Sequence, residues 1–236
     1  VFVHPAHGSD YCVRGGEQID KVGLSRPTAS ETASLAYFVL KNRKQPFLSE
    51  VADKMKNNYL WMFTGNLWVP NGDYEGVFVQ DNPEFKGRLP LMNKNDLIKK
   101  IQSGSKTIEG ITFSKDGTVR HAPFGFRTES QSTTQLGKNK YIVALFGSEE
   151  QAEKVAEIAD RYKINPYLFS FSSVDEPIIR VSSLVSDGDF DDDVLNVSGD
   201  DHDDGRLGCA FGIALAPKTF YMQTYNNLYG QIISLG

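Results

Sequence analysis

The stretch Ile111–Ala122, with the sequence ITFSKDGTVRHA, decides which class of fold this chain can adopt. Two runs typical of β-strands, ITFSK and TVRHA, flank the pair Asp116-Gly117. An Asp-Gly pair accepts the positive φ angles that a type I′ turn requires. The stretch therefore predicts a β-hairpin, and the rest of the chain is interpreted outward from it.

Upstream of the hairpin, the sequence predicts helices and short antiparallel strands. Thr28–Glu31 has the spacing of a capping box, and the apolar residues after it recur at helical intervals. A second amphipathic helix is expected over Ser49–Tyr59. Between Leu60 and Val79, aromatic segments alternate with turn signals, which is typical of short strands. Asn93–Gln102 is predicted to form a further short helix.

Downstream of the hairpin, the pattern changes after a polar connection. Arg127–Lys140 is predicted to be an exposed loop or a weak helix, and it is a candidate internal boundary. YIVALF (141–146) is predicted to be a buried strand, and a capping box that begins at Ser148 starts a helix extending to Tyr162. YLFSF (167–171) supplies another strand. Together these segments predict a βαβ unit with a right-handed crossover.

These elements predict a single α+β domain over residues 1–236: a mixed sheet with a β-hairpin region, helices packed on the sheet and one C-terminal βαβ unit. A three-layer α/β arrangement is the alternative. The hydrophobic fraction of 40% is typical of a globular protein. The apolar run Cys209–Ala216 is far shorter than the roughly twenty residues of a membrane-spanning helix. We expect a soluble, cytoplasmic protein, although a cleaved leader would leave no trace.

The acidic side chains are concentrated in one place. Nine of the thirty lie between Asp187 and Asp204, and this segment counted with Arg206 has a formal charge of −8 against −5 for the whole chain. Carboxylates this dense repel one another, so we expect a loop between two strands that a cation or a basic partner neutralises. A solvated loop without a ligand is the alternative. The candidate metal ligands, for calcium or zinc, are Asp187, Asp189, Asp191, Asp200, His202 and Asp204.

A second group of candidate residues follows the predicted amino-terminal strand VFVH. His4, His7, Asp10 and Cys12 lie within nine residues, and imidazole and carboxylate are ligands that zinc and related ions prefer. His4, His7 and Asp10, with His121, are the candidate catalytic residues of a hydrolase, either metal-dependent or phosphohydrolase-like. That chemistry requires the two ends of the chain to converge. Surface and capping roles are the alternative.

The opening VFVHPAHG, followed by GLSRPTASETASLAYFVL, resembles the start of the histidine phosphatases, in which a strand ends in Arg-His-Gly. The resemblance implies a phosphohistidine at His7 and arginines that hold the phosphate, but Ala6 stands where the motif has arginine. The opening is also similar to the His-x-His of metal-dependent phosphoesterases, which here is His4-Pro5-Ala6-His7. We assign the chain to neither family.

Basic and aromatic side chains interleave in RHAPFGFR (120–127), a mixture that nucleic-acid surfaces use. Aromatic residues in strands usually belong to the core, however, and a net charge of −5 gives no general attraction to polyanions. Nucleic acid is therefore not an expected partner. The sequence favours a binding or interaction module whose acidic segment meets a cation or a basic protein partner, with the hydrolase as the alternative.

Overall fold

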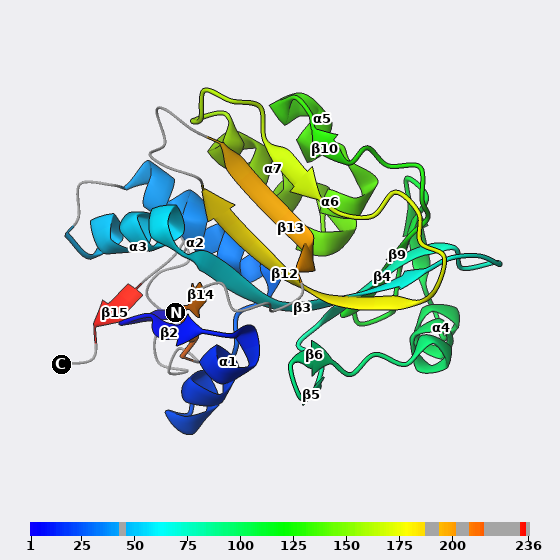
Figure 1. The fold of residues 1–236 in the computed structure, drawn as a ribbon, viewed down its shortest axis with the longest axis horizontal. Helices are drawn as coiled ribbons and strands as arrows, with labels where there is room; N and C mark the ends of the chain where they lie inside the picture. Colours follow the sequence, from blue (N-terminus) through cyan, green and yellow to red (C-terminus); the bar gives the residue numbers. More distant parts are fainter. Residues whose placement is uncertain (43–45, 187–193, 202–207, 215–231, 235–236) are drawn as a thin grey trace.

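The computed structural model describes all of the chain except residues 43–45, 187–193, 202–207, 215–231 and 235–236. Its described part is an α+β fold built on one large mixed sheet, as the sequence predicts (Figure 1). The strands run in the order β10-β11-β13-β12-β3-β4-β9-β8-β7, and β14 and β2 extend the sheet beside one end of β3. None of the described helices has the length and apolar character needed to cross a membrane.

The strands of the large sheet are β2 (His7–Asp10), β3 (Tyr59–Val69), β4 (Gly76–Asp81), β7 (Lys106–Ile108), β8 (Ile111–Phe113), β9 (Val119–Ala122), β10 (Glu129–Ser130), β11 (Tyr167–Phe169), β12 (Ile178–Ser186), β13 (Leu195–Asp201) and β14 (Gly208–Ala210). Two smaller sheets pair β1 (Phe2–His4) with β15 (Ile232–Ser234) and β5 (Phe85–Lys86) with β6 (Leu89–Pro90). Because β1 pairs with β15, and β2 pairs with β14, the two chain ends converge.

Helices cover both faces of the sheet. The described helices are α1 (Cys12–Lys21), α2 (Ala29–Lys41), α3 (Pro46–Asn57), α4 (Lys94–Gln102), α5 (Thr133–Gly137), α6 (Lys140–Phe146) and α7 (Glu149–Ala159). Apolar residues of α2, α3, α6 and α7 share one core with the sheet, whereas α1 and α4 bury their apolar residues in two other clusters. Successive side chains of a strand point to opposite faces, so β3 serves both layers.

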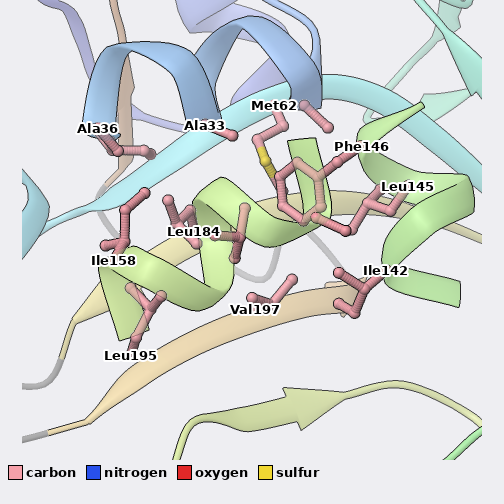
Figure 2. Packing of buried hydrophobic residues seen from close by; sticks show 14 of the residues in the cluster. Ala33, Ala36, Met62, Ile142, Leu145, Phe146, Ile158, Leu184, Leu195 and Val197 are labelled. Atoms are coloured by element: carbon pink, nitrogen blue, oxygen red, sulfur yellow. The ribbon is translucent and has the colours of Figure 1, made fainter. Parts of the chain in front are cut away.

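The largest core lies between the sheet and the helices α2, α6 and α7. Figure 2 shows the alanines of α2, the aliphatic and aromatic residues of α6, and strand residues such as Leu184 and Val197 meeting there. The small side chains of Ala33 and Ala36 let α2 approach its neighbours closely, and both are fully buried. The predicted capping box of α2 is confirmed, since Thr28 and Glu31 each accept a hydrogen bond from the other's backbone N–H.

The predicted hairpin is confirmed, but its turn is not type I′. β8 and β9 pair antiparallel, and the connection spans Ser114–Val119. Of Asp116 and Gly117, only Gly117 has a positive φ, of 73°. The Asp116 carboxylate instead accepts hydrogen bonds from the Ser114 hydroxyl and from the backbone and hydroxyl of Thr118, which lower its pKa to about 2. The side chain of Asp116, rather than its backbone, therefore stabilises the turn.

The predicted βαβ unit is wrong, because residues 141–146 form helix α6 rather than a strand. Asn139 caps this helix by accepting a hydrogen bond from the Tyr141 backbone, and Gly147 ends it with a φ of 84°. All six residues are buried, so the sequence shows no polar face to reveal a helical period. The parallel neighbour of β11 in the sheet is β13.

Smaller boundaries also differ from the predictions. The aromatic segments after Leu60 form one continuous strand, β3, instead of two short ones, and Tyr59 belongs to that strand rather than to the preceding helix. The polar connection 127–140 contains α5, whose capping box of Ser132 and Gln135 is complete. Asn93 caps α4 close to the predicted position. The assignment of the chain to a single domain stays a prediction.

A buried ion pair joins the central strands to the helices. The Arg120 guanidinium on β9, which is 3% exposed, binds both carboxylate oxygens of Asp81 on β4, with an Nη2–Oδ1 distance of 2.7 Å. Arg120 also donates to the Gly117 carbonyl in the hairpin turn. Asp81 accepts a hydrogen bond from the Thr64 hydroxyl, which in turn accepts one from the Ala29 backbone in the first turn of α2. One network therefore fixes β3, β4, β9 and α2 together.

We predict that Arg120→Met lowers the free energy of unfolding by about 3 kcal/mol, because it leaves the partly buried Asp81 carboxylate without its counter-charge. Guanidinium chloride unfolding measures the change. The control is Lys99→Met, which removes an exposed lysine 3.5 Å from Asp96 and should cost less than about 1 kcal/mol. Equal effects of the two substitutions would contradict the role assigned to Arg120.

Candidate functional site

The sequence predicted that the acidic segment Asp187–Asp204 is a loop between two strands. In the structure it is not a single loop. Leu195–Asp201 is strand β13, which lies between β11 and β12 in the large sheet. Residues 187–193 precede this strand and 202–207 follow it. A strand of seven residues is about 20 Å long, and this length separates the two ends of β13, to which 187–193 and 202–207 are joined. Gly208, which follows the second range, lies on β14 opposite Tyr59, and its neighbour Cys209 pairs with Leu60, which also pairs with Leu184 near the end of β12.

The alternation of residues in β13 explains why part of an acidic segment is a strand. Leu195 and Val197 are fully buried in the main core, and the alternate positions carry polar residues: Asn196 and Ser198, which are also buried, and the half-buried Asp200. This two-residue period is visible in LNVSGD and was the sequence signal for a strand, but the density of charge around it concealed it. Of the candidate metal ligands, Asp200 is described, whereas Asp187, Asp189, Asp191, His202 and Asp204 lie outside the described residues.

Asp200 lies near a cation of its own chain. Its carboxylate accepts a hydrogen bond from the Ser198 hydroxyl at 3.1 Å. Burial lowers the pKa of Arg180 on β12, and the negative charge of Asp200 partly offsets that effect. The Arg180 guanidinium also lies 5.7 Å from the centre of the Phe171 ring. The negative charge of Asp200 at this end of β13 is thus partly neutralised by Arg180 of the same chain.

The other end of β13 adjoins helix α3. The Ser186 hydroxyl, at the end of β12, donates a hydrogen bond of 3.2 Å to the Met55 carbonyl. Lys54 and Lys56 lie in the last turn of the same helix. Burial raises the pKa of the nearby Cys209 thiol to about 11 although the charge of Lys54 lowers it, so Cys209 is a protonated thiol at neutral pH. Positive charge of this chain therefore lies beside the point where residues 187–193 begin.

The amino-terminal candidates are described in part. His4 Nε2 lies 2.7 Å from a carboxylate oxygen of Glu50 on α3, a partner 46 residues away that sequence reasoning did not identify. His7 lies on β2, where partial burial lowers its pKa. Asp10 lies in the same strand opposite Gly208. Within the described part of the chain, no group of three His, Cys, Asp or Glu side chains could hold a metal ion.

His121 lies far from this group. Figure 1 places β9, which carries His121, at the other end of the molecule from β2. The His121 ring is 6% exposed and packs against the rings of Phe78 and Tyr74 at 4.8 and 5.5 Å. Its Nε2 has no hydrogen-bond partner among the described residues. The structure therefore does not bring His121 together with His4 and His7.

The aromatic residues of 120–127 belong to the core, as expected. Phe124 and Phe126 each lie 6.2 Å from the Trp68 ring, and Phe126 also stacks on Tyr141 at 5.4 Å. Cys12 and Cys209 are both buried, and no disulfide joins them. These side chains lie in the interior or, in the case of Phe124, pack against it.

The structure also contains a groove that sequence reasoning missed. Its volume is about 520 Å³, and Arg26, Asn82 and Phe85 are among the residues that line it. Asp20 binds the Arg26 guanidinium through both carboxylate oxygens, and Arg26 lies over the rings of Phe63 and Phe85. The charge of Arg26 is already paired with Asp20, so we assign Arg26 a structural role at this surface and not the binding of a ligand.

Comparison with known proteins gives one informative likeness. No family model and no curated protein matches the sequence, so the resemblance to the histidine phosphatases gains no support. A solved structure described as "Accommodation of massive sequence variation in Nanoarchaeota by the C-type lectin fold" is similar, with a TM-score of 0.53. The match covers 89% of this chain and 98% of that one at 14% sequence identity. The described fold therefore resembles the C-type lectin fold.

Burial of His121 predicts a pH-dependent stability. Burial lowers the folded-state pKa of His121, and hydrogen bonds to the carbonyls of Tyr74 and Glu75 only partly oppose this. The unfolded value is about 6.5, so the contribution of the neutral ring is complete above that pH and is lost as the pH falls toward the folded-state pKa. Burial also lowers the pKa of His7, so His7 adds to the same loss of stability at low pH.

We therefore expect the free energy of unfolding to decrease from pH 7 to pH 5. Each proton taken up on unfolding contributes a slope of up to about 1.4 kcal/mol per pH unit. The substitution His121→Phe should flatten this slope, with the remainder due to His7. Urea unfolding at half-unit pH intervals measures it, and identical slopes in the two proteins would show that His121 does not titrate with unfolding.

Proposed function

We propose that this chain is a binding module in which the acidic segment Asp187–Asp204 binds a cation or a basic protein partner. The observation that carries the proposal is the concentration of nine carboxylates around one strand of the sheet. Loops that carry function are commonly positioned by a rigid scaffold. Here β13 supplies that scaffold, because it is paired on both sides and its apolar residues are buried.

Calcium suits the segment better than zinc. Calcium takes six to eight oxygen ligands, whereas zinc prefers thiolate and imidazole together with carboxylate. The segment contains nine carboxylates and one imidazole, that of His202. Five of the carboxylates fall within residues 187–193, which is the densest part. We therefore infer that a cation at this segment is a hard, oxygen-binding one.

The cations that the described residues place near β13, counted with Arg206, are fewer than the carboxylates of the segment. Lys54 and Lys56 lie beside one end of β13, and Arg180 lies near Asp200. With Arg206, these amount to four positive charges against nine carboxylates. The excess is what a calcium ion or a lysine-rich surface of another protein would neutralise.

The fold likeness supports a binding role without specifying a ligand. The similar structure is described as one in which the C-type lectin fold accommodates massive sequence variation. A scaffold that tolerates change in this way suits a protein whose loops define what it recognises. No specific observation favours the hydrolase alternative, since His4 binds Glu50 and His121 is buried elsewhere.

A calcium titration followed by thermal unfolding tests the proposal. A specific ligand at one hundred times its Kd stabilises the folded state by about 2.7 kcal/mol, which for a chain of this size raises Tm by several degrees. Changing the five aspartates at 187, 189, 191, 192 and 193 to asparagine should abolish this shift. The matched control changes five exposed carboxylates elsewhere: Asp73, Asp96, Glu149, Glu153 and Asp175.

The basic-partner form of the proposal has its own measurement. Binding of a fluorescent oligolysine peptide at low salt should weaken in the Asp-to-Asn protein but not in the control. If neither millimolar calcium nor the peptide distinguishes the wild type from the Asp-to-Asn protein, the acidic segment is a solvated one and the proposal is wrong.

A further inference from the structure

The turn between β3 and β4 contains the one Asn-Gly pair of the sequence, Asn71-Gly72. Both residues are exposed to solvent. The turn begins after Val69, the last residue of β3, and ends before Gly76, the first residue of β4, and these two residues pair in the sheet. Within the turn, the Glu75 N–H donates a hydrogen bond of 3.0 Å to the Gly72 carbonyl. The sheet therefore fixes the two ends of this turn and leaves Asn71 and Gly72 open to water.

The groups that could react at this pair are not held by the rest of the molecule. Within the part of the chain that the structure describes, neither the Asn71 side-chain amide nor the Gly72 N–H has a hydrogen-bond partner. Gly72 has a φ of 92°, and beyond its chain neighbours no heavy atom lies within 4 Å of the place that a Cβ would occupy. Since glycine also adopts a wide range of backbone angles, its nitrogen can approach the Asn71 Cγ.

The Asp-Gly pair in the turn between β8 and β9 provides a contrast, because both of its groups are held. The Gly117 N–H donates a hydrogen bond of 2.9 Å to the Ser114 carbonyl. The Asp116 carboxylate accepts hydrogen bonds from Ser114 and Thr118, and its pKa of about 2 keeps it ionised at neutral pH. An ionised carboxylate resists attack by a nucleophile, so this second pair is protected in two ways.

We propose that Asn71 is a site of covalent modification, by deamidation with water as the co-reactant. Asparagine is one of the thermolabile residues of proteins. The Gly72 nitrogen forms a bond to the Asn71 Cγ, the bond from Cγ to Nδ2 breaks, and ammonia leaves with the proton that the Gly72 nitrogen gives up. A water molecule then opens the resulting succinimide ring at either carbonyl carbon, which produces aspartate or isoaspartate. No residue of the acidic segment takes part, so this site is independent of the proposed function.

The reaction changes both the charge and the path of the chain at the turn. It adds a carboxylate close to Asp73 and Glu75, which the turn already carries. In the isoaspartyl product the main chain runs through the side-chain carbons of residue 71 and is one carbon atom longer. The products therefore differ from the parent chain in charge, and the two products differ from each other in the path of the backbone.

The test incubates the full chain in buffer and follows it by peptide mapping with tandem mass spectrometry. Residue 71 should gain the small mass difference between a hydroxyl and an amino group, and the conversion should be faster at about pH 8 than at about pH 6, because the attacking nitrogen must lose its proton. A synthetic peptide that spans residues 67–77 shows the conversion without the fold. If the peptide converts and the folded chain does not, the proposal is wrong.

Two variants show that the conversion belongs to this pair. Asn71→Gln keeps the amide but moves it one carbon further from the backbone, so that ring closure is slow and the mass change at residue 71 should be lost. The matched control is Asn95→Gln on α4, which changes an exposed asparagine followed by an aspartate and should leave the conversion of Asn71 as it is. The same mass change in both variants would place the reaction at another residue.

Unfolding tests the contrast with the second turn. In guanidinium chloride the hydrogen bonds that hold Asp116 and the Gly117 N–H are lost, so isoaspartate should form at Asp116, whereas the folded chain should form none there. Chromatography of the peptides separates the isoaspartyl form, which has an unchanged mass. Equal isoaspartate at Asp116 in the folded and unfolded chains would show that these bonds do not select the site.

Discussion

The structure depends on the buried contact between Arg120 and Asp81. A guanidinium in the interior is stable only when its charge is compensated, and most donors of Arg120 are also used, with Nε left without a partner among the described residues. Asp81 supplies the charge, and carbonyl groups of Gly117 and Leu145 accept further hydrogen bonds. Because these groups come from β4, the hairpin turn and α6, the position of one side chain sets how a helix layer lies on the sheet. The planar fork of arginine provides several donors at once, which lysine could not.

Interactions between residues close together in the sequence were predictable, whereas the secondary structure of a run whose side chains are all buried was not. The cap of α2 depends on Thr28 and Glu31, three residues apart, so the sequence alone identifies it. The strand and helix interpretations of residues 141–146 could not be separated, because all of these side chains are buried in the structure. Only the flanking Asn139 and Gly147 distinguish them, as the cap and the positive-φ terminus of a helix. Caps deserve more weight than apolar content in such runs.

At the candidate site, too, some features were predictable from the sequence and others were not. Composition located the acidic segment, but the count of charges hid the alternation that places Leu195 and Val197 in the core. Contacts between distant segments, such as that of His4 with Glu50, have no counterpart in the local sequence. The sequence therefore indicated which residues could carry chemistry, and the fold decided which of them could act together.

The position of β13 changes how the acidic segment must be understood. The two ends of β13 lie about 20 Å apart, which is roughly two Debye lengths at 0.1 M salt. The chain re-enters the sheet after 202–207 at Gly208 on β14, next to Cys209, which shares the partner Leu60 with Leu184 of β12. Exposed charges at the two ends of β13 are therefore largely screened from each other, whereas the return of the chain at Gly208 lies near the end of β12 and within the influence of Lys54, whose charge acts on Cys209. Each end also has its own cations, Lys54 and Lys56 beside Ser186 and Arg180 near Asp200. It follows that a cation at residues 187–193 would compete for the carboxylates with the lysines in the last turn of α3.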